Sequence, residues 1–150
     1  MVLSKQAVKV GYVYDQIYLR HDTGDHVENA KRLETIISRL EESGLKKQLT
    51  LIKPRRASIE ELGLIHSKQH ISQVEAVARM GGGSLDADTV MSPDSYEAAL
   101  YAVGGAIRAA EAVMDDKVKS AFALVRPPGH HATPTRAMGF CLFNNIAIAA

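Results

Sequence analysis

Two adjacent histidines, His130 and His131, are the residues of this sequence best suited to chemistry. They lie near the end of the segment AFALVRPPGHHA, in which a short apolar run is followed by an arginine, two prolines and a glycine. An imidazole side chain exchanges protons near neutral pH, so this residue type suits general acid–base catalysis. The prolines restrict the backbone, and we therefore expect both rings to be presented on a stiff loop.

Residue type and spacing alone leave three roles open for such a pair. Loop histidines most often face solvent or make structural hydrogen bonds, and this is the simplest interpretation. They could instead bind a metal ion, although zinc usually needs a third protein ligand and no HExxH or CxxC motif accompanies them. Their position makes catalysis as well supported as a structural role, because open α/β proteins bind ligands beyond the carboxyl ends of sheet strands.

The elements that would position this loop are expected to alternate between strand and helix. Apolar and β-branched runs predict strands, and apolar residues at helical spacing predict helices. The alternation indicates an α/β fold with a mainly parallel sheet covered by helices. The predicted strands are 8–14, 49–52 and 121–125, and the predicted helices are 28–40, 58–64, 68–80 and a long one over 92–114.

Local signals define the ends of several of these elements. Ser67 is suited to cap the helix that follows it. Ser92 and Pro93 predict the start of the long helix, with the cap at Ser92 and the proline at the first helical position. Between these two helices, the glycines at 81–83 end a helix, and residues 84–91 are expected to form a loop.

Composition excludes several classes of protein. The chain has 150 residues and a formal net charge of +1, which indicates no general attraction to nucleic acid or to a membrane surface. No apolar run is long enough to span a bilayer, and the N-terminal stretch lacks the apolar core of a signal peptide. Cys141 is the only cysteine, so no intrachain disulfide can form, as expected for a cytoplasmic protein. We expect its thiol to be buried and unreactive, and the oligomeric state stays open.

Four further histidines are candidate site residues. His66 and His70 are four residues apart and could share a helix face as a metal pair. A structural or surface position is favoured, because a cap at Ser67 leaves His66 outside the helix. His21 and His26 flank a polar loop and could reach the mouth of a site, but solvated positions are favoured for them.

The segment RPPGHHA and the MGFCLFNN that follows it resemble the central signature of the histone deacetylase superfamily. This superfamily includes bacterial and archaeal deacetylase-like amidohydrolases, acetoin-utilisation proteins and acetylpolyamine hydrolases. Three flanking segments are similar as well: HVENAKRL resembles the family's HPExPxRL, HSKQHI its HSxxYI, and LDADT with SPDSYEAA its DxDTxxSPxSYEAA. Val27 and Ala30 replace two usual prolines, and His70 stands where an aromatic residue is common.

The resemblance implies a three-layer α/β/α fold and a zinc-dependent amidohydrolase that removes acetyl or other short acyl groups from lysine or polyamine amines. His130 and His131 would be its tandem proton-handling pair, with the main proton transfer on His131 and electrostatic support from His130, and the division of roles stays open. Gly139 and Phe140 would line the substrate channel. Asp88 would lie at the channel rim, with Asp86 as the alternative.

The resemblance also implies that part of the site lies outside this sequence. The family's zinc ligands and its transition-state tyrosine are C-terminal to the signature, so no metal ligand is assigned within residues 1–150. We expect these residues to be the N-terminal part of a single deacetylase-like domain, incomplete at the C-terminus and inactive alone. The alternative is a truncated, inactive fragment or binding module. A nucleotide-binding role for GGGSLD is disfavoured, because no strand precedes it and no Lys-Ser/Thr follows.

Overall fold

The structure is a computed structural model that describes residues 9–150. Val8, where the first predicted strand begins, lies outside the described residues. The same holds for residues 1–8 of the N-terminal stretch in which no signal peptide is expected. Within residues 9–150, no helix combines the length and the apolar character needed to cross a membrane.

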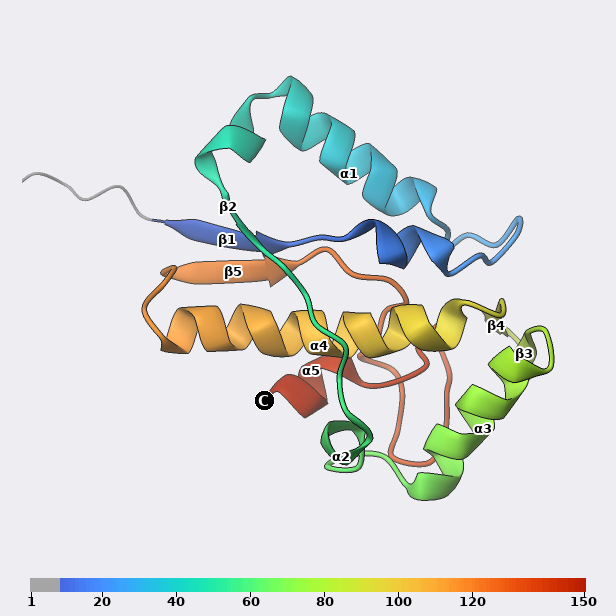
Figure 1. Ribbon diagram of the computed structural model, residues 1–150. Helices are drawn as coiled ribbons and strands as arrows, with labels where there is room; N and C mark the ends of the chain where they lie inside the picture. Colours follow the sequence, from blue (N-terminus) through green and yellow to red (C-terminus); the bar gives the residue numbers. More distant parts are fainter. Residues whose placement is uncertain (1–8) are drawn as a thin grey trace, which may run out of the picture.

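A parallel sheet with the strand order β2-β1-β5 forms the middle layer of the described chain. Helix α1 covers one face of this sheet and the long helix α4 covers the other (Figure 1). The predicted α/β/α fold with a parallel sheet is therefore confirmed. The bounds of these elements are β1 Val10–Val13, α1 Lys31–Glu42, β2 Thr50–Ile52, α4 Ser95–Met114 and β5 Ser120–Ala123.

The other elements connect these layers, and α2, α3 and α5 lie on the side of α4 that faces away from the sheet (Figure 1). Helix α3 packs against α4, and α5 packs against α4 as well. Ser67 caps α3, as predicted, because its side chain accepts the backbone N–H of His70. The bounds are η1 Gln16–Arg20, η2 Leu45–Gln48, α2 Ile59–Leu62, α3 Lys68–Arg79, β3 Gly83–Asp86, β4 Thr89–Met91 and α5 Asn145–Ala149.

Two sequence predictions about the segment between α3 and α4 were wrong. Residues 84–91 do not form a loop, because β3 and β4 pair as an antiparallel hairpin. The long helix begins at Ser95 and not at Ser92. The hydroxyl of Ser92 accepts the backbone N–H of Asp22 at 3.1 Å and donates to the carbonyl of Arg20 at 3.3 Å, so it ties a distant loop instead of capping the helix.

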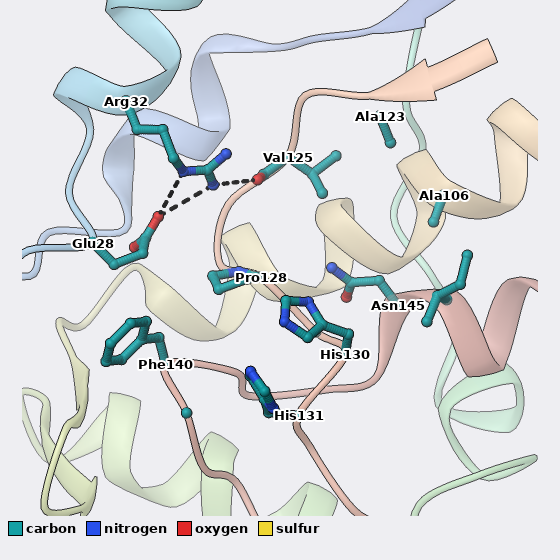
Figure 2. Close-up of a pocket in the computed structure, with 13 residues that line it drawn as sticks. Glu28, Arg32, Ala106, Ala123, Val125, Pro128, His130, His131, Phe140 and Asn145 are labelled. Atoms are coloured by element: carbon teal, nitrogen blue, oxygen red, sulfur yellow. Dashed lines mark hydrogen bonds and ion pairs between the residues drawn. The ribbon is translucent and has the colours of Figure 1, made fainter.

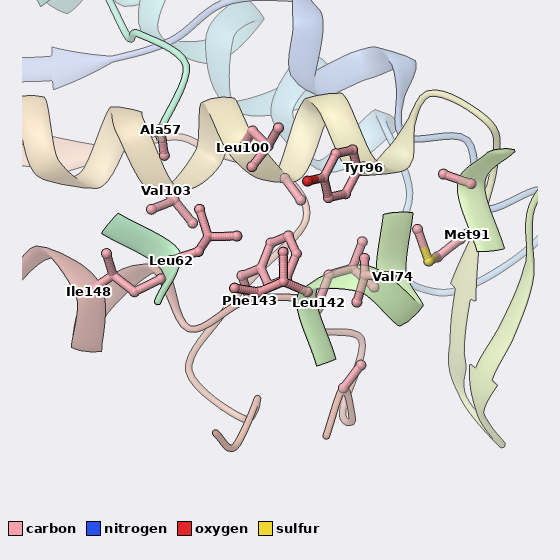
Figure 3. Close-up of a cluster of buried hydrophobic side chains, with 14 residues drawn as sticks. Ala57, Leu62, Val74, Met91, Tyr96, Leu100, Val103, Leu142, Phe143 and Ile148 are labelled. Atoms are coloured by element: carbon pink, nitrogen blue, oxygen red, sulfur yellow. The ribbon is translucent and has the colours of Figure 1, made fainter. Parts of the chain in front are cut away.

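Helix α4 lies between the two hydrophobic clusters of the described chain. One cluster joins α4 to α2, α3 and α5 and includes Leu100 and Val103 (Figure 3). The other joins α4 to the sheet and α1. Two glycines let the helix approach its neighbours closely: a Cβ on Gly104 would overlap the carbonyl oxygen of Arg55, and one on Gly105 would lie 2.6 Å from the hydroxyl of Tyr18.

Gly104→Ala is expected to lower the free energy of unfolding by about 1–3 kcal/mol, because the added methyl group collides with the Arg55 backbone. This opposes the gain of about 1 kcal/mol that alanine normally brings to a helix interior. Urea denaturation of both proteins measures the difference. Gly63→Ala is the control, since the added methyl would meet only the carbonyls of its own turn, at 3.3 Å. Equal stability of the two variants would contradict the packing argument.

Candidate functional site

The two candidate histidines lie on the loop that follows β5, beyond the carboxyl end of this strand. The rings of His130 and His131 have centroids 4.2 Å apart and are inclined by 51°. Both side chains are exposed in the described chain. Figure 2 shows them at the edge of a cleft, with Phe140 on one side and Asn145 on the other. The structure thus brings the predicted histidines and the predicted channel phenylalanine together.

The cleft has a volume of about 620 Å³ and mainly apolar walls. Glu28 and Arg32 lie across it from the histidines (Figure 2). One Arg32 nitrogen donates to Glu28 at 3.2 Å and to the carbonyl of Val125 at 3.0 Å. The lining residues that the sequence did not identify as part of a site include Glu28, Arg32, Ala106, Ala123, Val125 and Asn145.

Gly139 and Phe140 form one wall of this cleft, as the resemblance implies for a substrate channel. Gly139 packs directly on a histidine: a Cβ there would lie 2.8 Å from Cγ of the His131 ring. Phe140 has a φ of 70°, which is uncommon for a bulky residue. Its backbone N–H donates to Oγ1 of Thr89 at 3.1 Å, and its ring meets the ring of His26 edge-on at 4.7 Å.

The two aspartates weighed as rim residues take different places. Asp88 is exposed on the turn of the β3–β4 hairpin and accepts the hydroxyl of Thr89 at 3.2 Å, which links it to Phe140. Asp86 accepts a hydrogen bond from Arg136 at 3.1 Å, and this pairing commits its carboxylate to the loop at 133–136. Neither carboxylate lines the cleft itself, so the assignment of Asp88 to the rim stays a prediction.

A buried ion pair anchors the start of the loop that carries His130 and His131, residues 127–132, called here the histidine loop. Arg126 is fully buried, and its guanidinium donates to both oxygens of Glu28, at 2.8 and 3.0 Å. A further nitrogen of Arg126 donates to the carbonyl of Tyr18 at 3.1 Å. Burial alone raises the pKa of the Glu28 carboxyl, but the hydrogen bonds and charge of Arg126 with the charge of Arg32 outweigh it, so the net pKa is lowered.

His21 belongs to the same buried network, and its expected solvated position was wrong. Its side chain is 1% exposed, Nδ1 lies 2.7 Å from Oγ of Ser95, and Nε2 lies 3.8 Å from a Glu28 oxygen. Burial, reinforced by the charge of Arg126, lowers its pKa from 6.5 to about 4. His26, also expected in solvent, is half-buried against Phe140.

The other weighed residues are structural. Cys141 is fully buried, and burial raises the pKa of its thiol, as expected for an unreactive side chain. His66 and His70 are both 3% exposed and contact the backbone at Asn144 and Leu142. The structural interpretation of these two histidines is confirmed.

Sequence comparison agrees with this geometry. A family model described as the histone deacetylase domain matches residues 26–150. The chain belongs to the histone deacetylase family. It is 42% identical, over 91% of its length, to a protein of Methanothermobacter thermautotrophicus named "Probable deacetylase". It is 36% identical, over 93% of its length, to human histone deacetylase 7.

Structural comparison supports the same deacetylase fold. The crystal structure of the HDA15 HD domain matches with a TM-score of 0.89 and 33% identity over 94% of this chain. The matched region is 40% of the archaeal relative, 18% of the human protein and 42% of the HDA15 chain. The chain therefore spans about two fifths of the archaeal deacetylase that it resembles.

Zinc is the metal that histone deacetylase membership implies, and a catalytic zinc site needs about three protein ligands. Within residues 9–150, no group of three or more His, Cys, Asp or Glu side chains is arranged to hold a metal ion. The residues described for this deacetylase-family chain therefore do not fit a zinc site by themselves.

Glu28→Gln is expected to lower the free energy of unfolding of this deacetylase-family protein by about 3–5 kcal/mol. The substitution leaves the buried Arg126 guanidinium without its counter-charge. Denaturation in urea measures the loss. Glu75→Gln removes the partly exposed partner of the exposed Arg79 and should change stability by less than about 0.5 kcal/mol. A loss for Glu28→Gln as small as that of the control would show that the buried pair is not structurally important.

Acid is expected to destabilise the protein partly through His21. The unfolded state binds a proton on this residue below its ordinary pKa of 6.5, whereas the native state does so only near a pKa of about 4. Stability therefore falls as pH decreases across this window, by roughly 3 kcal/mol from His21. His21→Asn should flatten the dependence of unfolding free energy on pH between about 6.5 and about 4. An unchanged slope would contradict the prediction.

Proposed function

We propose that this chain supplies the proton-transfer residues and one channel wall of a zinc-dependent amidohydrolase. Its substrates would be lysine or polyamine amines that carry acetyl or other short acyl groups. The observation that carries the proposal is the placement of two adjacent histidine rings beside a mainly apolar cleft walled by Phe140. An aromatic face in such a cleft suits the methylene stem of an acylated amine. We place the zinc ligands outside residues 9–150.

In this proposal His131 moves the proton that amide hydrolysis requires. It accepts a proton from the attacking water as the oxygen adds to the acyl carbon. It then returns this proton to the amine nitrogen as the carbon–nitrogen bond breaks, which yields a carboxylic acid and an amine. The ring of His130 lies beside that of His131 and gives it electrostatic support during this proton transfer. Asp88 lies on the hairpin whose Thr89 binds the Phe140 backbone N–H. At the rim, its carboxylate accepts hydrogen bonds from polar groups of the substrate.

A second candidate is a binding module without turnover. It is favoured by one observation, the lack of a three-ligand metal group among the side chains of residues 9–150. Zinc content and turnover of the protein encoded by the full reading frame separate the two candidates. An enzyme would bind zinc stoichiometrically and lose turnover with a chelator, whereas a binding module would show no turnover in either state.

The division of labour between the two histidines is tested in that full-length protein. His131→Ala is expected to lower kcat by about 10²–10⁴-fold on an acetyl-lysine peptide or an acetylated polyamine, because it removes the proton carrier. His130→Ala should have a smaller effect, since it removes only a neighbouring ring. Thr135→Ala, at an exposed position of the same loop, is the control and should keep full activity. A larger loss for His130→Ala would reverse the assigned roles.

A further inference from the structure

Two buried histidines at the start of α3, His66 and His70, are not used in the proposed reaction. Both contact one backbone segment, residues 142–144. His66 precedes the cap of this helix, and His70 lies in its first turn. Nε2 of His66 lies 2.8 Å from the backbone nitrogen of Asn144. Nε2 of His70 lies 2.9 Å from the backbone oxygen of Leu142. The two rings thus contact two backbone groups of the same short segment.

These contacts determine where each ring carries its proton. A backbone N–H can only donate, so Nε2 of His66 must accept from Asn144 and the neutral ring is protonated on Nδ1. A backbone carbonyl can only accept, so Nε2 of His70 must carry a proton to donate to Leu142. Burial, followed by the neighbouring His70, lowers the pKa of His66, which favours the neutral ring that this arrangement requires.

The rings of His66 and His70 are also packed against each other and against Phe143. The centroids of the two imidazole rings are 4.9 Å apart. The centroid of the Phe143 ring lies 5.4 Å from that of His66 and 5.7 Å from that of His70. Phe143 is fully buried at the centre of the cluster drawn in Figure 3, between α4 and α3. Burial and these ring contacts restrict the orientation of both imidazole rings.

The segment held by these rings in turn holds both ends of the histidine loop. The side-chain amide of Asn144 donates to the carbonyl of Ala132 at 2.9 Å, directly after His131. The side-chain amide of Asn145 donates to the carbonyl of Pro127 at 3.3 Å, at the start of the loop. Between these ends, a Cβ on Gly129 would lie 2.5 Å from the Asn145 backbone nitrogen, so the two segments are in close contact.

We propose that His66 and His70 are positioning residues that set the geometry of the two candidate catalytic histidines. They act through Asn144 and Asn145, which transmit the position of α3 to the loop. The catalytic consequence rests on the proposed function, whereas the structural connection does not. A phenylalanine at position 70 would fill the same space but could not donate to Leu142.

The first test uses kinetics of the full-length protein. His66→Leu removes the acceptor for the Asn144 N–H and is expected to lower kcat about tenfold or more, with KM changed less than about twofold. His66→Gln can place its side-chain oxygen near the position of Nε2 and should recover kcat to within about threefold of the parent. Failure of glutamine to recover more activity than leucine would overturn the proposal.

Val74→Ala is the matched control for a purely structural effect. Val74 is fully buried on the same helix and in the same cluster, so its truncation should lower the melting temperature without moving the loop. At temperatures where all variants are folded, its kcat should stay within about twofold of the parent. If His66→Leu behaves like Val74→Ala, His66 serves stability alone and the proposal is wrong.

A second measurement does not depend on turnover. Long-range proton–nitrogen spectra of the full-length protein, labelled on histidine nitrogens, report the ring environments of His130 and His131. These resonances should shift in His66→Leu and stay in place in Val74→Ala. Resonances that are unmoved in both variants would overturn the positioning role. If the parent lacks deacylase activity, the proposed function fails and these spectra alone decide the further inference.

Discussion

The bidentate ion pair between Arg126 and Glu28 is the interaction on which the site depends most. It joins the loop after β5 to the segment before α1, across 98 residues of sequence. A guanidinium buried this deeply requires its counter-charge, so the two segments must close on each other when the protein folds. Because Pro127 follows directly, this closure defines where the histidine loop begins, and the contact from Asn144 to Ala132 defines where it ends.

The layered fold could be predicted from patterns that are local in sequence. Short apolar runs became the strands of the parallel sheet, and the cap at Ser67 began its helix as expected. The hairpin of β3 and β4 was missed because both strands are short, and because β3 contains glycine and aspartate, which have a low preference for strands. The start of α4 was misplaced because Ser92 bonds to Asp22 and Arg20, and no local pattern reveals such a contact.

The site was predictable where its residues are neighbours in sequence. His130, His131 and Phe140 come from one loop region, and the family resemblance implied that they share a place beside a channel. Glu28 and His21 come from a distant segment, and a single sequence carries no signal that pairs them with Arg126. Burial of histidine is equally hard to predict, because this side chain can be satisfied in solvent or in the core, and only its partners decide which.

The shape of the cleft also depends on residues of α4 with little or no side chain. Ala106 lines the cleft and directly follows Gly104 and Gly105, whose bare backbone lies against the Arg55 main chain and the Tyr18 hydroxyl. A helix held this closely from two directions has no room to retreat when a larger molecule enters. The wall at Ala106 is therefore expected to be rigid, so that the size of any ligand in the cleft is limited on this side.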